Sequence, residues 1–422
     1  MQAHQAPNRG TLFSGYRGRE ARTRLQKAIP LLLMLLMAYS IVRDIVAATV
    51  NPLFNDEILT QIVASQPTAN AIWDALARGI DSHPPLFYLV EGFSLKLYSN
   101  PHIALRLPAI LAFPCIILCV FVYLRNRYKN DVGFLSSTFL MTTSVFLTHG
   151  ANARAYGMVM ACMSLALVCY QRVSSPFWTV MLAVALALGE ALHYFTIFSM
   201  LPFGVAELVY SLQSRKVRWR VWTALTFGAV PLIMCWPLLS NLRSHYGPHY
   251  FVHFGLSSIP VIYGQFLFTG AALGTGLVAA CVAAVVSARF LRGEQHLDAE
   301  RLENNRVEGA LLLTLLALPL TTYAVAKIMH GTLADRYVLT TVLGLALSLA
   351  CVMSLAKGKA LALFAFFILA VAGIHELSFW RSLHSLQLDN PAESVQTFVE
   401  KVGAPDLPVA VPDGLTFLEL SY

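Results

Sequence analysis

Stretches of about 20 apolar residues recur along this chain, and they limit its possible folds more than any other feature. They begin near Pro30 and continue almost to Trp380. A helix of that length crosses a bilayer with all its backbone polar groups satisfied internally. The alternating pattern of a transmembrane strand is lacking. We therefore predict an all-α integral membrane protein.

Composition agrees with this fold class. Hydrophobic residues make up 57% of the 422 residues and charged residues only 13%, and the mean hydropathy is +0.61, well above that of a soluble domain. The net charge of +7 arises from Lys and Arg residues that separate the apolar runs. Such a distribution indicates membrane topology rather than nucleic-acid binding. We expect membrane lipids, and no nucleic acid, as partners.

The basic clusters predict which loops face the cytoplasm. RNRYK at 125–129, QSRKVRWR at 213–220 and the charged stretch at 288–306 fall on one side if residues 51–104 do not cross the membrane. If 85–98 crossed instead, every later basic cluster would face outward, against the positive-inside rule. We therefore predict a polytopic bundle of about 11 transmembrane helices. The predicted spans are 28–50, 105–124, 133–150, 155–170, 177–192, 195–212, 219–239, 258–290, 309–329, 336–355 and 360–380.

This topology divides the chain into three regions. Residues 1–27 form a basic cytoplasmic N-terminus, 28–380 a transmembrane domain, and 381–422 a periplasmic C-terminal segment. The last segment is too short to close a domain, so it either packs on the bundle or belongs to a longer protein. Within the first periplasmic loop, at 51–104, apolar residues recur at helical spacing and Pro84–Pro85 can begin a helix. We predict interfacial helices there.

Two acidic residues follow the first span directly. Asp56 and Glu57, in NPLFNDE, would lie just outside the bilayer at the start of an interfacial helix. One of these carboxylates could accept a proton from an incoming hydroxyl group. Alternatively, both could simply favour the positive end of the helix dipole.

Several basic residues are predicted at the same membrane face. His83 precedes the double proline and could orient a carboxylate or contact a phosphate, or merely occupy a turn. Arg106 opens the second span, while Arg154 and Tyr156 open the fourth. Two arginines at one face suit a phosphate clamp, although snorkelling to lipid headgroups is the alternative.

Two further segments return to the outer face. His193, in LHYF, lies at an outward turn, and Arg336–Tyr337, in DRYVL, opens a later span. Ionisable groups at that depth tend to face a cavity. We therefore expect one outer pocket formed by the candidate residues Asp56, Glu57, His83, Arg106, Arg154, Tyr156, His193, Arg336 and Tyr337.

The order of these motifs resembles a known superfamily. NDE, HPPLFY, ALRLP, ARAYG, LHYF and DRYVL follow one another as in the GT-C superfamily of membrane glycosyltransferases. The likeness is strongest to the protein O-mannosyltransferase and lipid A aminoarabinose transferase group, which is glycosyltransferase 39-like. It covers residues 28–380.

The resemblance implies a reaction. A sugar would move from a polyprenyl-phosphate donor to an acceptor lipid, glycan or protein at the periplasmic side of the inner membrane. Asp56 would be the base or the carboxylate that orients the acceptor, with Glu57 assisting, and Arg154 and Arg336 would hold the carrier phosphate. Many aminoarabinose-type relatives carry lysine at the position of His83, which weakens the inference of that sugar. Because one attacking acceptor needs no enzyme nucleophile, we expect a single displacement that inverts the configuration of the sugar.

The sequence leaves other points open. No cofactor is indicated, a divalent metal is possible, and its ligands are unknown. A polytopic lipid or glycan transporter, or flippase, without bond chemistry is the main alternative, and it predicts that Asp56→Asn is tolerated. A membrane glycan polymerase or ligase is a closer alternative, distinguished by a product that grows by many units.

Overall fold

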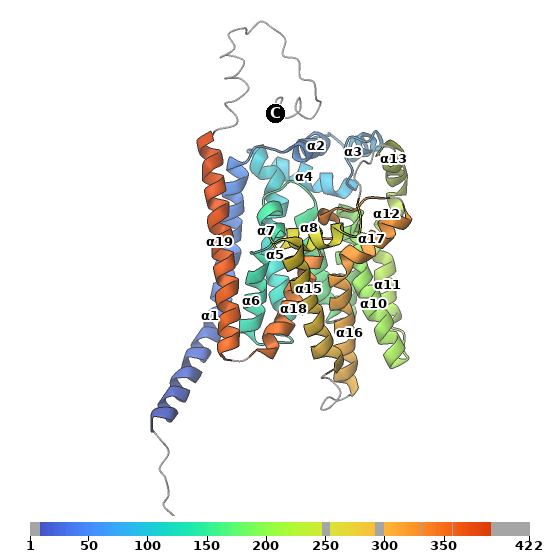
Figure 1. Cartoon of the computed structure of the whole chain (residues 1–422). Coiled ribbons are helices and arrows are strands. Elements are labelled where there is room, and N and C mark those ends of the chain that lie inside the picture. The colour runs from blue at the N-terminus through green and yellow to red at the C-terminus, as the bar shows by residue number, and fades with distance from the viewer. Residues whose placement is uncertain (1–8, 247–253, 292–298, 330, 357, 390–422) are drawn as a thin grey trace, which may run out of the picture.

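The computed structural model describes residues 9–246, 254–291, 299–329, 331–356 and 358–389 (Figure 1). Every regular element within these ranges is a helix, which confirms the all-α prediction. Residues 1–8 of the predicted N-terminal region and 390–422 of the predicted C-terminal segment lie outside the described part of the chain.

The first and last helices lie side by side at one edge of the bundle (Figure 1). Helix α1, Arg9–Val50, begins within the predicted N-terminal segment, and its apolar part is Gln26–Val50. Helix α19, Lys359–Asp389, continues past the predicted end of the last span at Trp380.

A buried arginine joins these two helices. Arg43 is fully buried and pairs with Asp44 and, at 2.8 Å, with Glu376 of α19. A charge in an apolar environment is stable only when it is paired and hydrogen-bonded. The contact between Arg43 and Glu376 therefore anchors α19 to α1.

Three short helices follow α1, as predicted. They are α2 (Asn55–Ala64), α3 (Ala69–Ala77) and α4 (Pro85–Leu97). The Thr68 hydroxyl caps α3 by accepting from the backbone N–H of Ala71, and a proline occupies the first turn of α4. Figure 1 shows all three helices across one end of the bundle.

The remaining helices form the bundle. They are α5 (Pro101–Arg125), α6 (Asn130–Leu140), α7 (Ser144–His149), α8 (Tyr156–Tyr170), α9 (Pro176–Leu192), α10 (Thr196–Ser214), α11 (Trp219–Gly228), α12 (Val230–Met234), α13 (Trp236–Tyr246), α14 (Ser258–Phe266), α15 (Ala271–Val286), α16 (Ala299–Leu316), α17 (Leu318–Ile328) and α18 (Thr341–Leu355). A π turn, Ser287–Leu291, extends α15, and a 3-10 turn, Asp335–Tyr337, precedes α18.

The predicted number of about 11 spans is not confirmed. Among the described residues, four helices are long and apolar enough to cross a membrane, or up to six if each bent pair counts as one span. The pairs bend by 52° between α11–α12 and α13 and by 58° between α16 and α17. Proline explains these breaks, because Pro237 and Pro319 are the second residues of the helices that follow the two bends and cannot continue a preceding helix.

The predicted span at 133–150 is also interrupted. Helix α6 ends at Leu140 and α7 begins at Ser144. Between them the hydroxyls of Thr142 and Thr143 donate to carbonyls three residues earlier. Such local side-chain bonds compete with the helical pattern.

Polar contacts gather several predicted cytoplasmic turns at one end of the bundle. The Asn126 amide donates to Gln171, which joins the ends of α5 and α8. Tyr170, at the end of α8, and Arg218, before α11, both contact Glu207 of α10. Figure 1 shows this end opposite α2, α3 and α4. Which of these two ends faces the cytoplasm stays a prediction.

Candidate functional site

A buried ion pair fixes the connection between α1 and α2. The Arg106 guanidinium meets the Glu57 carboxylate through two hydrogen bonds, of 2.9 Å from Nε and 2.6 Å from Nη2. Its remaining donors bond to backbone carbonyls at the end of α1 and just beyond it. These acceptors are Ala48, Asn51 and Pro52.

The other contacts of Glu57 are also internal. Its carboxylate accepts from the backbone N–H groups of Phe54 and Ala153, at 3.0 and 2.7 Å. Only 2% of Glu57 and 2% of Arg106 is exposed. Neither side chain is free to meet a substrate, so the expectation that Glu57 assists the base and Arg106 binds phosphate needs correction. We interpret both as positioning residues that hold α2 against α5 and the segment before α8.

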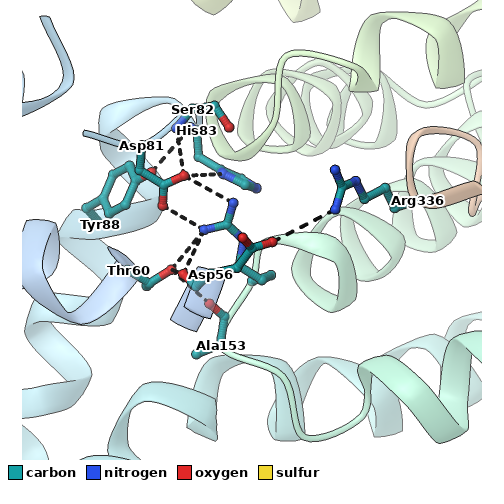
Figure 2. Close-up of polar contacts among 9 residues, drawn as sticks. Asp56, Thr60, Asp81, Ser82, His83, Tyr88, Ala153 and Arg336 are labelled. Atoms are coloured by element: carbon teal, nitrogen blue, oxygen red, sulfur yellow. Dashed lines mark hydrogen bonds and ion pairs between the residues drawn. The ribbon is translucent and has the colours of Figure 1, made fainter. Parts of the chain in front are cut away.

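A second buried pair involves an acid that sequence reasoning missed. Arg154 Nη1 and Nη2 donate to the two Asp81 carboxylate oxygens at 2.6 and 3.1 Å (Figure 2). Both residues are 5% exposed. Asp81 stands two residues before His83, and its closeness to the HPPLFY motif was the one available signal.

Arg154 also supports the helix that carries Asp56. Its Nη1 donates to the backbone carbonyl of Asp56 and to the Thr60 hydroxyl, each at 3.1 Å. The guanidinium therefore connects the α3–α4 segment with the first turns of α2. Because Asp81 already neutralises it, Arg154 is less available to a carrier phosphate than the sequence suggested.

The open charged groups of the site are Asp56 and Arg336. Asp56 Oδ2 lies 3.9 Å from Arg336 Nη1, and their side chains are 37% and 46% exposed. The carboxylate comes from α2 and the guanidinium from the 3-10 turn before α18 (Figure 2). This pair is the part of the cluster that a substrate can reach.

A small pocket lies beside Arg336. Its lining combines the Arg336 guanidinium with aromatic and apolar side chains. Tyr337 stacks on Phe195 with ring centroids 3.8 Å apart and planes 4° apart. The lining residues that the sequence had predicted for the site are Tyr156, His193, Arg336 and Tyr337.

Two histidines near Arg336, His83 and His193, contact each other. The His83 and His193 rings are nearly perpendicular, with centroids 4.8 Å apart. Burial, reinforced by the positive charge of Arg154, lowers the pKa of His83 well below its usual range. Burial, followed by Arg154 and Arg336, lowers the pKa of His193 to about 3. Both imidazoles are therefore neutral at physiological pH.

The described residues contain no preformed cluster of metal ligands. No group of three or more His, Cys, Asp or Glu side chains there lies close enough to hold an ion. All seven cysteines are free thiols.

The structure thus brings together most of the predicted site. Asp56, Arg154 and Arg336 converge as expected, with His83, Tyr156, His193 and Tyr337 beside them. Glu57 and Arg106 lie next to this cluster and bind each other.

Comparison with known proteins places the fold. Residues 82–240 match the family model described as dolichyl-phosphate-mannose-protein mannosyltransferase. The structure is similar to that of ArnT from Cupriavidus metallidurans bound to undecaprenyl phosphate, with a TM-score of 0.54 and 14% identity. The chain therefore shares the fold of ArnT. The apo form of ArnT is similar too, with a TM-score of 0.53 and 13% identity.

These matches are partial in extent. The two alignments with ArnT cover 81% and 80% of this chain, and the chain spans 64% and 62% of the respective ArnT chains. No curated protein sequence matches. The family model includes His83, Arg154 and His193 but ends before Arg336 and begins after Asp56. The likeness to ArnT therefore establishes the fold, while the chemistry depends on the local geometry.

Proposed function

We propose that this protein is a membrane glycosyltransferase that uses a polyprenyl-phosphate sugar donor. The observation that carries the proposal is the accessible Asp56–Arg336 pair, 3.9 Å apart beside the pocket. The likeness to ArnT, whose structure was determined with undecaprenyl phosphate, supports a lipid phosphate as the donor. The acceptor is a lipid, glycan or protein on the periplasmic side.

The two charged groups suit the two ends of the reaction. Asp56 accepts the proton of the acceptor hydroxyl while its oxygen attacks the anomeric carbon of the sugar. The bond between this carbon and the phosphate oxygen breaks, and its electron pair leaves with polyprenyl phosphate. Arg336 stabilises the departing phosphate. Attack opposite the leaving group inverts the configuration.

The buried pairs have a supporting role in this reaction. Glu57, paired with Arg106, accepts from the backbone N–H of Phe54, just before α2. Arg154, paired with Asp81, donates to the backbone carbonyl of Asp56. The Asp56 side chain therefore projects from a rigid backbone. A base held in one position removes the entropic cost of finding the reactive geometry. We therefore assign the phosphate to Arg336, and a positioning role to Arg154.

The proposal is tested by supplying purified protein with a panel of polyprenyl-phosphate sugars and candidate acceptors. Release of polyprenyl phosphate is the readout. We expect Asp56→Asn to lower the rate by about 100-fold or more, because general-base catalysis is worth about that much. Asp74→Asn is the matched control, since Asp74 is an exposed acid of α3 in the same loop.

The outcomes separate this proposal from the transporter alternative. A transporter would release no polyprenyl phosphate from any donor and would tolerate Asp56→Asn. Acceptor-dependent release that disappears in Asp56→Asn and persists in Asp74→Asn supports a glycosyltransferase. A product that grows by many sugar units would indicate a polymerase.

A further inference from the structure

His83 is a buried imidazole without a hydrogen-bond partner. It is 3% exposed, and neither ring nitrogen has a partner among the described residues. Asp81 Oδ1 is the nearest acidic atom, but it lies 4.0 Å from Nδ1, beyond hydrogen-bonding distance. Buried polar atoms are almost always satisfied. Both nitrogens therefore need a hydrogen-bond partner that the described residues do not supply.

The surroundings of His83 place these nitrogens at the reactive end of the site. Its ring contacts those of His193 and Tyr156, and both of these residues line the pocket. Figure 2 shows the His83 side chain between Asp81 and Arg336.

The tautomer of His193 is set by its own backbone contact. Its Nδ1 accepts a hydrogen bond from the backbone N–H of Phe195 at 3.1 Å. A neutral ring with Nδ1 as acceptor carries its proton on Nε2. His193 thus offers one donor, whereas His83 offers one donor and one acceptor.

We propose that His83 and His193 form a subsite for the hydroxyl groups of the transferred sugar, and that this sugar carries no amino group. This inference rests on the proposed function and names its substrate class. A hydroxyl both donates and accepts, so it matches a pair of neutral imidazoles. A phosphate is matched better by the guanidinium of Arg336.

The charge balance of the site disfavours an amino sugar. Two carboxylates face this region, and each already pairs with an arginine, Asp81 with Arg154 and Asp56 with Arg336. A protonated amine at these histidines would lie near the guanidinium groups of Arg154 and Arg336, and like charges repel strongly at low dielectric. Asp56 must also remain able to accept the acceptor's proton.

The first test compares two matched donors. One is a polyprenyl-phosphate hexose with hydroxyls only, and the other has a primary amine in place of one hydroxyl. We expect kcat/KM to be at least about tenfold higher for the hydroxyl donor. Equal or faster release from the amine donor would overturn the assignment of the sugar class.

The second test uses donors that each lack one sugar hydroxyl, with wild type, His83→Leu and His83→Gln. One deoxy donor should lose about tenfold in kcat/KM with wild type, because a buried imidazole then loses its partner. The same deletion should cost little in His83→Leu, which has no group to lose. His83→Gln keeps a donor and an acceptor and should retain the discrimination.

These outcomes are separable from failure of the glycosyltransferase proposal. No release from any donor with wild type would reject the function itself. Turnover of the hexose donor, with His83→Leu slowing every deoxy donor by the same factor, would instead show a purely structural histidine. Monodisperse elution and an unchanged melting temperature establish that each variant is folded.

Discussion

Adjacent acids in this protein have different environments, and burial decides what each can do. Glu57 is buried in a hydrogen-bond network with Arg106 and backbone N–H groups. The Asp56 carboxylate lies 3.9 Å from the Arg336 guanidinium and remains accessible. The sequence shows only the dipeptide. Because a helix turns by 100° per residue, neighbouring side chains necessarily face different surroundings.

Replacing Glu57 should damage stability rather than chemistry. In Glu57→Gln the Arg106 guanidinium keeps its charge but loses its buried counter-charge, which costs about 3–5 kcal/mol when a buried pair is broken. Thermal unfolding in detergent should show a clearly lower melting temperature. Asp56→Asn should melt as wild type does, because exposed pairs contribute little. An inactive Glu57→Gln protein with unchanged melting would place Glu57 in the reaction itself.

The lowered pKa of His193 predicts a direction for the effect of acid on stability. Its pKa is about 3 in the folded protein, compared with 6.5 for an unperturbed histidine, so the unfolded chain binds the proton more tightly. The contribution of neutral His193 to the free energy of unfolding is complete above pH 6.5. It is lost as the pH falls from 6.5 towards 3. The free energy of unfolding should fall by at most about 1.4 kcal/mol per pH unit from this group.

Substitution of His193 isolates this contribution. In His193→Gln the dependence of melting temperature on pH should be shallower below pH 6.5 than in wild type. Melting curves between about pH 5 and pH 8 measure it. Parallel curves for the two proteins would mean that other groups control acid sensitivity.

At the scale of elements, helix α4 supports α2 through a glycine. A Cβ atom on Gly92 would lie 2.6 Å from the backbone oxygen of Ala64, the last residue of α2. Backbone cannot move aside as a flexible side chain can. The position of α2, and with it Asp56, therefore depends on the missing side chain at residue 92.

Gly92→Ala should slow the reaction. Separating α2 from α4 by even a fraction of an ångström displaces the base, and misplacement of about 1 Å can cost about 100-fold. We expect the initial rate of polyprenyl phosphate release to fall by about tenfold or more. Gly276→Ala in α15 is the matched control, because a Cβ there meets nothing within 4 Å. Equal rates in the two variants would show that α2 is positioned without this contact.

Element types were predictable, whereas element lengths were not. The apolar spacing in 51–104 predicts α2 and α3, and Pro84–Pro85 predicts the start of α4. Hydropathy cannot show that 219–239 and 309–329 bend, because apolar residues continue through each break. The prolines there were visible, but membrane helices often tolerate proline, as α5 does at Pro108 and Pro114.

At the scale of the whole molecule, one topological rule predicted much of the site. Assigning basic clusters to one side places Asp56, Arg154 and Arg336 at the opposite end, where they converge. The rule says nothing about partners within that end. It therefore could not reveal that Asp81 forms an ion pair with Arg154, or that Glu57 forms one with Arg106.

The predicted orientation can be tested across the whole bundle with two introduced cysteines. Ser65 lies in the exposed connection between α2 and α3, and Lys216 is exposed between α10 and α11, at the opposite end. Because positive loops remain in the cytoplasm, a membrane-impermeant maleimide should label Ser65→Cys in intact cells. It should label Lys216→Cys only after permeabilisation, with wild type giving the background of the native cysteines. Labelling of Lys216→Cys, but not Ser65→Cys, in intact cells would put the Asp56–Arg336 pair in the cytoplasm, where a periplasmic acceptor could not reach it.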